Sequence, residues 1–257
     1  MNTEILLIEI GALIGYLIVT WLVSVKLRDV SIIDIAWGPG FGVVALVHFV
    51  TGEVHWRAWL VFGLTIIWGG RLAFHIWSRH RGKPEDSRYR KWREEGGQNW
   101  WWTSFFRVFL LQGVLLWVIA RPLAVSMQTA PEFWTLWDTI GIVIWTIGFI
   151  IEMTADGQLA KYLKLQQRES FLRTGLWKYS RHPNYFGEAL LWWGFGAFGV
   201  AAGYDWILIS PVMITLLLRF FSGVPLLERS MRTKPGYNEY SQRTNAFIPW
   251  IPKKVSQ

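Results

Sequence analysis

Seven apolar stretches, separated by polar segments, constrain this chain more than any other feature. Each is close to the length of about 20 residues that a helix needs to cross the hydrocarbon core of a bilayer. They cover residues 4–25, 32–51, 57–78, 104–124, 134–155, 184–202 and 205–222. With 52% hydrophobic residues and 19 tryptophans, the composition is typical of a polytopic membrane protein with aromatic belts. We therefore predict an all-α membrane helix bundle with about seven transmembrane helices, formed as a single domain over residues 1–257.

Lysine and arginine residues predict how the bundle is oriented. They gather in alternate connections, namely 26–31, 79–103, 156–183 and the tail after 222. The connections between these, 52–56, 125–133 and 203–204, carry none, although Arg57 and Arg121 lie beside them at helix ends. The positive-inside rule then predicts an N-terminus outside and a C-terminus in the cytoplasm. The net charge of +8 follows from these inner loops, so we expect no nucleic-acid partner.

Several kinds of chemistry are excluded by what the chain lacks. It contains no cysteine, which rules out disulfides and thiolate ligands or nucleophiles. Its five histidines do not follow a metal-ligand spacing, so we predict no metal site. The glycine pairs have no strand–helix context for a phosphate loop.

Ionisable residues inside or at the ends of the apolar stretches are costly at membrane depth and therefore informative. On the predicted topology they lie toward the cytoplasmic side, apart from Glu9 in the outer half of the first stretch, and we expect those on the cytoplasmic side to converge on one cavity there. The alternative is that they pair with one another and only hold helices together. Those on the cytoplasmic side are Asp34, Arg71, Glu152, Asp156, Glu188, Arg219 and Glu228.

The stretch 175–194, GLWKYSRHPNYFGEALLWWG, combines these features. Its Arg-His-Pro turn predicts a helix start with free backbone donors, and it leads into an apolar helix that contains Glu188. The turn supplies Arg181, His182 and Asn184, and the aromatic residues for stacking are Trp177, Tyr179 and Tyr185.

Two further segments, 71–89 and 152–164, and the tail 236–250 complete the set. Together they offer cations for phosphates, polar groups for ribose hydroxyls and aromatic rings for bases. This mixture suits a dinucleotide.

The same residues resemble the steroid 5-alpha-reductase superfamily. The resemblance rests on GLWKYSRHPNYFGE, on the preceding E-x-x-x-D and on the tail Y-x-x-Y…FIPW. The whole chain is similar to a bacterial branch of membrane proteins in that superfamily, through D-x-x-W-G at 34–38, the 71–89 segment and A-D-x-Q at 155–158. A more distant similarity is to isoprenylcysteine carboxyl methyltransferases.

The resemblance implies a seven-helix bundle that holds NADPH, with NADH as the alternative, in a cavity facing the cytoplasm of a bacterial inner membrane. It implies reduction of a C=C bond conjugated to a carbonyl in a lipophilic, sterol-like or isoprenoid-like small molecule, with membrane lipid around the protein. The cofactor-binding half would span about 134–257. The implied cofactor-binding residues are Arg71, Lys83, Arg88, Tyr89, Glu152, Asp156, Lys164, Trp177, Tyr179, Arg181, His182, Asn184, Tyr185, Glu188, Arg219, Glu228, Tyr237 and Tyr240.

One departure from the reductases concerns the proton donor. They orient the substrate carbonyl with a Gln-Glu pair and a tyrosine, which by spacing fall on Ile33-Asp34 and Trp68 here. Only the acid is kept, so Asp34 is the predicted catalytic residue. Two alternatives remain open: a methyltransferase of the isoprenylcysteine or phospholipid type that uses S-adenosylmethionine, and a non-catalytic lipid-binding membrane protein.

Overall fold

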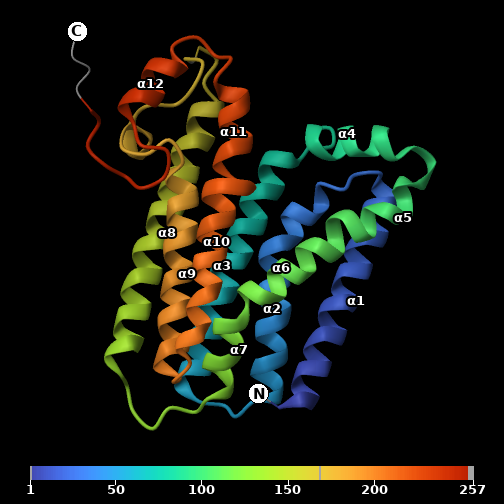
Figure 1. Ribbon diagram of the computed structural model, residues 1–257, viewed down its shortest axis with the longest axis vertical. Coiled ribbons are helices and arrows are strands. Elements are labelled where there is room, and N and C mark those ends of the chain that lie inside the picture. The colour runs from blue at the N-terminus through green and yellow to red at the C-terminus, as the bar shows by residue number, and fades with distance from the viewer. Residues whose placement is uncertain (1, 168, 254–257) are drawn as a thin grey trace. The chain divides into compact units, whose positions relative to one another are not determined.

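The computed structural model describes residues 2–167 and 169–253, and every regular element among them is helical (Figure 1). Six helices, or runs of consecutive helices, are long and apolar enough to cross a membrane, which confirms an all-α membrane protein. They span Thr3–Leu27, Ile32–Thr51, Trp56–His80, Ser87–Ile119, Leu136–Leu163 and Asp205–Met231. The remaining predicted stretch, 184–202, forms the 19-residue helix α9, which is not one of these six. Seven spans and the orientation of the termini stay predictions.

The chain forms two compact units. The first comprises the chain up to Trp134 together with Ala202–Tyr204, and the second comprises Thr135–Ala201 and the chain from Asp205. The helices of the first unit are α1 (Thr3–Leu27), α2 (Ile32–Thr51), α3 (Trp56–His80), α4 (Ser87–Gly96), η1 (Gly97–Asn99), α5 (Trp100–Ser104), η2 (Phe105–Leu110), α6 (Leu111–Ile119) and α7 (Arg121–Gln128).

In the first unit, α2 packs between α1 and α3. The contact with α3 is made backbone to backbone, because a Cβ atom at Gly38 would lie 2.5 Å from the carbonyl oxygen of Gly69. Glycine lets two membrane helices approach this closely, and the approach improves their van der Waals packing.

A buried ion-pair cluster ties α1 to α2 and α7. Glu9 and His48 are fully buried, and Arg121 is 4% exposed. The Glu9 carboxylate is bound by both terminal nitrogens of Arg121 and lies 3.0 Å from Nε2 of His48. Nδ1 of His48 lies 2.8 Å from the amide nitrogen of Gln128. Each charge therefore has an opposite charge or a polar partner, which removes most of the cost of placing it among apolar helices.

The second unit is built around the pair α8 and α9. Its helices are α8 (Leu136–Leu163), η3 (Gly175–Lys178), α9 (Pro183–Ala201), η4 (Asp205–Leu208), α10 (Ile209–Leu216), η5 (Leu217–Phe221), α11 (Val224–Met231) and α12 (Tyr237–Arg243). Thr135 and Asp138 form a reciprocal capping box that begins α8. As predicted, α9 begins at Pro183, where the missing N–H of proline costs no helical hydrogen bond.

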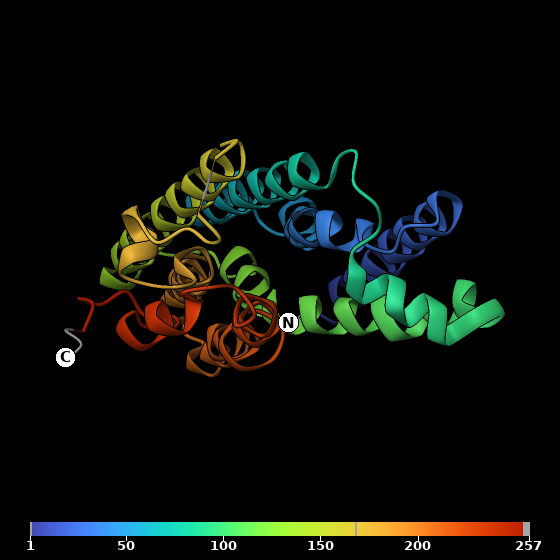
Figure 2. The same cartoon turned by 90° about the horizontal axis from the view of Figure 1, so that it is seen from above.

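Four glycines bring α8 and α9 together along their length, and the two helices lie side by side in both views (Figure 1 and Figure 2). A Cβ atom at Gly148 would lie 2.5 Å from the backbone nitrogen of Leu191, and one at Gly187 would lie 2.6 Å from that of Glu152. Gly141 and Gly194 meet in the same way one heptad further along. Because the contact is made by backbone atoms, it fixes the register of the two helices.

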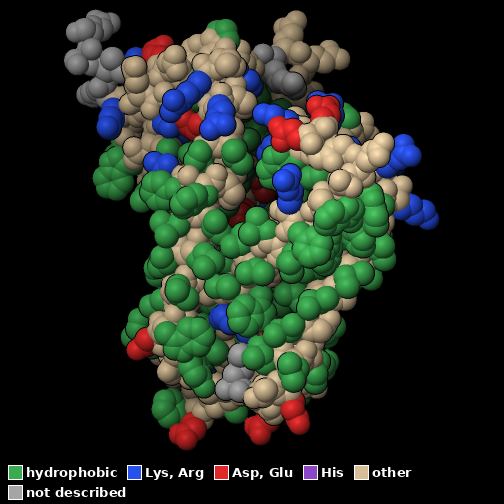
Figure 3. Space-filling view, turned by 45° about the vertical axis from the view of Figure 1, so that its right-hand side comes forward, with side chains coloured by type: hydrophobic (Ala, Val, Ile, Leu, Met, Phe, Trp, Pro, Cys, Tyr) green, Lys and Arg blue, Asp and Glu red, His purple; other side chains and the backbone are tan. Residues whose placement is uncertain are grey.

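Hydrophobic side chains cover the flanks of the helices, and Lys and Arg side chains gather beyond one end of this apolar surface (Figure 3). In the second unit, that end carries the loop after α8, the turn before α9, and α12. The functional candidates of this unit lie there.

Candidate functional site

The contact between α8 and α9 brings together four predicted cofactor-binding residues of the second unit. Glu152 and Asp156 lie one turn apart on α8 and are 2% and 5% exposed. Glu188, on α9, is 9% exposed. Nδ2 of Asn184 donates a hydrogen bond to Oδ1 of Asp156 over 3.2 Å. The predicted turn therefore does direct Asn184 toward α8, and the half-buried amide and the three buried carboxyl residues make up a polar cluster.

The turn that precedes α9 is fixed by the C-terminal segment. Ser180 and Asn245 form a parallel bridge, and the backbone N–H of Arg181 donates to the carbonyl of Asn245 over 2.9 Å. Oγ of Ser180 donates to the carbonyl of Phe247 and accepts from the N–H of His182. The tail is thus part of the folded site, although it lies more than 60 residues further along the chain.

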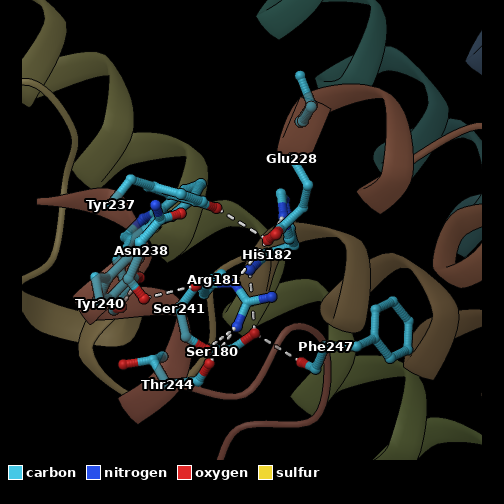
Figure 4. A network of polar contacts seen from close by, with 12 residues as sticks. Ser180, Arg181, His182, Glu228, Tyr237, Asn238, Tyr240, Ser241, Thr244 and Phe247 are labelled. Carbon is cyan, nitrogen blue, oxygen red and sulfur yellow. Dashed lines mark hydrogen bonds and ion pairs between the residues drawn. The ribbon is translucent and has the colours of Figure 1, made fainter. Parts of the chain in front are cut away.

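Glu228 is the centre of a network in this region, drawn in Figure 4. Its Oε1 atom accepts from Nε of Arg181 over 2.6 Å and from the hydroxyl of Tyr237 over 2.9 Å, and it lies 3.1 Å from Nε2 of His182. Nη1 of Arg181 also donates to the carbonyls of Ser241 and Thr244. Charge-assisted hydrogen bonds of this kind are stronger than neutral ones, so Glu228 holds α11, α12 and the turn together.

The tyrosines of α12 are buried on the same side. Burial raises the pKa of Tyr237, and the neighbouring Glu228 carboxylate raises it further. Burial likewise raises the pKa of Tyr240, whose hydroxyl donates to the carbonyl of Trp177. Both phenols stay protonated as donors, and Phe171 packs against both rings.

Five residues predicted to bind a cofactor thus form contacts that fold the tail: Arg181, His182, Glu228, Tyr237 and Tyr240. His182 is 3% exposed, its ring stacks on that of Tyr185 at 5.8 Å, and its Nδ1 atom is buried without a hydrogen-bond partner.

A second polar cluster lies in the first unit around Asp34, the predicted catalytic residue. The hydroxyl of Tyr89 donates to Oδ1 of Asp34 over 2.7 Å, and Nη2 of Arg88 donates to Oδ2 over 3.2 Å. Nε2 of Gln112 donates to the hydroxyl oxygen of Tyr89 over 3.3 Å. An acid on α2, a phenol on α4 and an amide on α6 therefore meet, with Tyr89 only 4% exposed.

The connection between α3 and α4 positions Tyr89. Glu85 accepts from the backbone N–H of Val30 and pairs with Arg93 over 2.8 Å. The backbone N–H of Asp86 donates to Oγ of Ser31. Burial opposes ionisation of Asp86, but hydrogen bonds from the side chain and backbone of Arg88 outweigh it and hold the Asp86 pKa below its usual value. The charged motif of residues 85–89 therefore closes over the start of α2.

The other predicted residues lie outside the contacts described so far. Arg71 is half-buried on α3, whereas Lys83 and Lys164 are exposed. Trp177 is buried and donates to the carbonyl of Ala155, and Tyr179 is exposed. Arg219 is half-buried in η5, with its guanidinium 4.9 Å from the ring centre of Phe220.

Gln112 is the site residue that sequence reasoning missed. It lies in an apolar stretch with no motif around it, and only its polarity at membrane depth could have indicated it.

Comparison with known proteins shows which family the chain belongs to. A family model described as a protein of unknown function, DUF1295, matches residues 20–244. The chain belongs to the DUF1295 family. The matched region contains both polar clusters and ends at Thr244, just before the segment that pairs with the turn.

The chain is also similar to a protein of fission yeast. The uncharacterized protein C594.04c of Schizosaccharomyces pombe is 26% identical over 274 residues, which cover 93% of this chain and 79% of the relative. No solved structure matches the chain.

Proposed function

We propose that this DUF1295 protein is an integral membrane reductase that uses NADPH, or NADH, to reduce a C=C bond conjugated to a carbonyl in a lipophilic substrate. The proposal extends the resemblance to the steroid 5-alpha-reductase superfamily. The observation that carries it is the meeting of Asp34, Tyr89 and Gln112. These are an acid, a phenol and an amide, the three kinds of group with which those reductases orient a carbonyl, although two of them come from other positions in this chain.

The chain's own groups suggest how a carbonyl would be activated. The Tyr89 hydroxyl donates its proton to Asp34, and by turning toward a bound carbonyl oxygen it would donate that proton there instead. Gln112 donates to the phenol oxygen and fixes its direction. Polarisation of the carbonyl makes the β-carbon of an enone electrophilic, and the nicotinamide would supply hydride to that carbon.

The residues of the second unit fit part of a dinucleotide. The Asn184 amide and the carboxyl groups of Glu152, Asp156 and Glu188 match the hydrogen-bonding needs of ribose hydroxyls and a carboxamide. Arg181 is a weaker candidate for a phosphate than its sequence position suggests, because Glu228 and two carbonyls already occupy it. Lys164 and Arg219 are the other predicted cofactor-binding cations of this unit.

Ligand binding tests the first step. Purified protein in detergent should unfold at a higher temperature with NADPH or NADH than without, because a ligand that binds only the folded state stabilises it. Glu152→Gln and Asn184→Ala should reduce this shift, whereas Gln98→Ala, at an exposed position on η1, should not. No shift with either nucleotide would overturn the proposal. A shift with S-adenosylhomocysteine alone would favour the methyltransferase alternative.

A further inference from the structure

The segment 245–253 crosses the turn before α9 and exposes a group of large apolar side chains. Ile248, Trp250 and Ile251 are 59%, 67% and 76% exposed. These side chains are exposed although backbone hydrogen bonds hold the segment in place. The N–H of Trp250 donates to the carbonyl of Tyr179 over 2.9 Å, and the N–H of Lys253 donates to that of Arg243 over 2.9 Å.

The position of this segment relative to the membrane follows from the residues that it packs against. The buried Phe247 forms a cluster with Ala189 of α9 and Val224 of α11, and its ring contacts that of Phe186. Leu218 of η5 packs against the same cluster. Leu218 and Val224 belong to the apolar run Asp205–Met231, which is long enough to cross a membrane. Phe220 and Phe221 in the same run are 56% and 68% exposed. The apolar side chains of the tail are therefore level with the end of a membrane-spanning segment.

The same surface carries a cleft of about 240 Å³, lined by Tyr179, Pro249, Trp250 and Ile251. Lys178 and Lys253 border these residues in sequence and are exposed, and Nζ of Lys178 lies 5.7 Å from the ring centre of Tyr179. An apolar cleft edged by lysines is complementary to one kind of molecule beside a membrane protein, a phospholipid with an anionic headgroup.

We propose that residues 246–253 and Lys178–Tyr179 form a binding site for an anionic phospholipid at the membrane interface. Trp250 and Ile251 enter the boundary between headgroups and acyl chains, and Lys178 and Lys253 pair with the headgroup phosphate. This site is separate from the polar clusters proposed for catalysis, and it requires no nucleotide.

The absence of cysteine from the chain allows a direct test. Ile251→Cys, labelled with an environment-sensitive fluorophore, is placed in nanodiscs of phosphatidylcholine with or without phosphatidylglycerol, and quenching by lipids with a nitroxide near the headgroup is measured. Asn238→Cys, at an exposed position of α12, is the matched label. We expect quenching at position 251 to exceed that at position 238 by about twofold or more, and to increase with phosphatidylglycerol.

The lysines are tested in the labelled protein. Lys178→Gln together with Lys253→Gln should abolish the increase with phosphatidylglycerol, whereas Arg232→Gln, which removes an exposed charge elsewhere in the unit, should leave it. Thermal unfolding confirms that each variant is folded. Equal quenching at the two labels, or quenching at position 251 that is insensitive to phosphatidylglycerol, would overturn the proposal.

Discussion

The phenol of Tyr89 donates a hydrogen bond of 2.7 Å to the carboxyl group of Asp34, although 55 residues separate them along the chain. The two groups come from different helices, and the bonded connection 85–88 holds them together. In the proposed reaction, the Tyr89 phenol would take the part of the tyrosine that the resemblance places at Trp68.

Loss of the phenol should slow the proposed reaction. We expect Tyr89→Phe to lower kcat by roughly 10²–10⁴-fold, the usual contribution of a positioned proton donor. Tyr204→Phe is the matched control. The measurement is NADPH oxidation with a lipophilic enone, and an unchanged kcat in Tyr89→Phe would exclude the phenol from the reaction.

The ion pair of Glu9 and Arg121 should be essential for stability. Glu9→Gln leaves the arginine buried without its counter-charge, which typically costs about 3–5 kcal/mol. Glu4→Gln, at an exposed position in the first turn of α1, should have little effect. Thermal unfolding in detergent compares the two, and equal midpoints would show that the pair contributes no net stability.

The close contact of α8 and α9 should not tolerate a methyl group. Gly148→Ala places a Cβ atom 2.5 Å from a backbone nitrogen of α9, and we expect a loss of about 1–3 kcal/mol. Gly157→Ala is the control on the same helix, because no atom lies within 4 Å of its Cβ position. That variant should gain up to about 1 kcal/mol from helix propensity. A stabilised Gly148→Ala protein would mean that the helices are further apart.

The Glu228 network should determine whether the tail stays folded. Glu228→Gln weakens three hydrogen bonds at one oxygen, at a cost of roughly 2 kcal/mol. Amide exchange in residues 244–250 should become faster, while Glu239→Gln, which alters an exposed pair with Arg243, should leave it unchanged. Unchanged exchange in Glu228→Gln would show that backbone bonds suffice to hold the tail.

His55 makes the stability of α3 depend on pH. Its Nδ1 atom accepts from the N–H of Ala58, and its Nε2 atom lies 3.1 Å from the carbonyl of Met127. Burial lowers the pKa of His55 from its ordinary value of 6.5. Because the unfolded state binds the proton more readily, the contribution of His55 is complete above about 6.5 and is lost as the pH falls from there toward the folded-state value. His55→Asn keeps a capping oxygen without titrating, so its unfolding midpoint should depend less on pH in this range.

Much of the fold could be predicted from apolar runs, because each run long enough to span a bilayer has few alternatives to a helix. All seven predicted stretches are helical, and α9 begins at the predicted proline. The π-helical segments η2 and η5 could not be predicted, since one extra residue in a turn leaves no mark in an all-apolar pattern.

The candidate site was harder to predict because its contacts join distant positions. The turn indicated that Asn184 points inward, but its bond with Asp156 became known only from the structure. Gln112 meets Tyr89 only through packing within the first unit, which no local motif encodes. Arg181 was predicted to bind a cofactor, but its guanidinium pairs with Glu228. Glu228 lies 47 residues further along the chain, so no local motif indicated this pair.

The glycine contacts of α8 and α9 have a mechanical consequence. Two helices that touch through backbone atoms cannot slide past each other by changing side-chain rotamers, so the pair moves as one rigid body. If a ligand reaches the carboxyl groups near the end of this helix pair, we expect the movement in the segments beside the pair. These are the connection after Leu163 and the tail that crosses Tyr179.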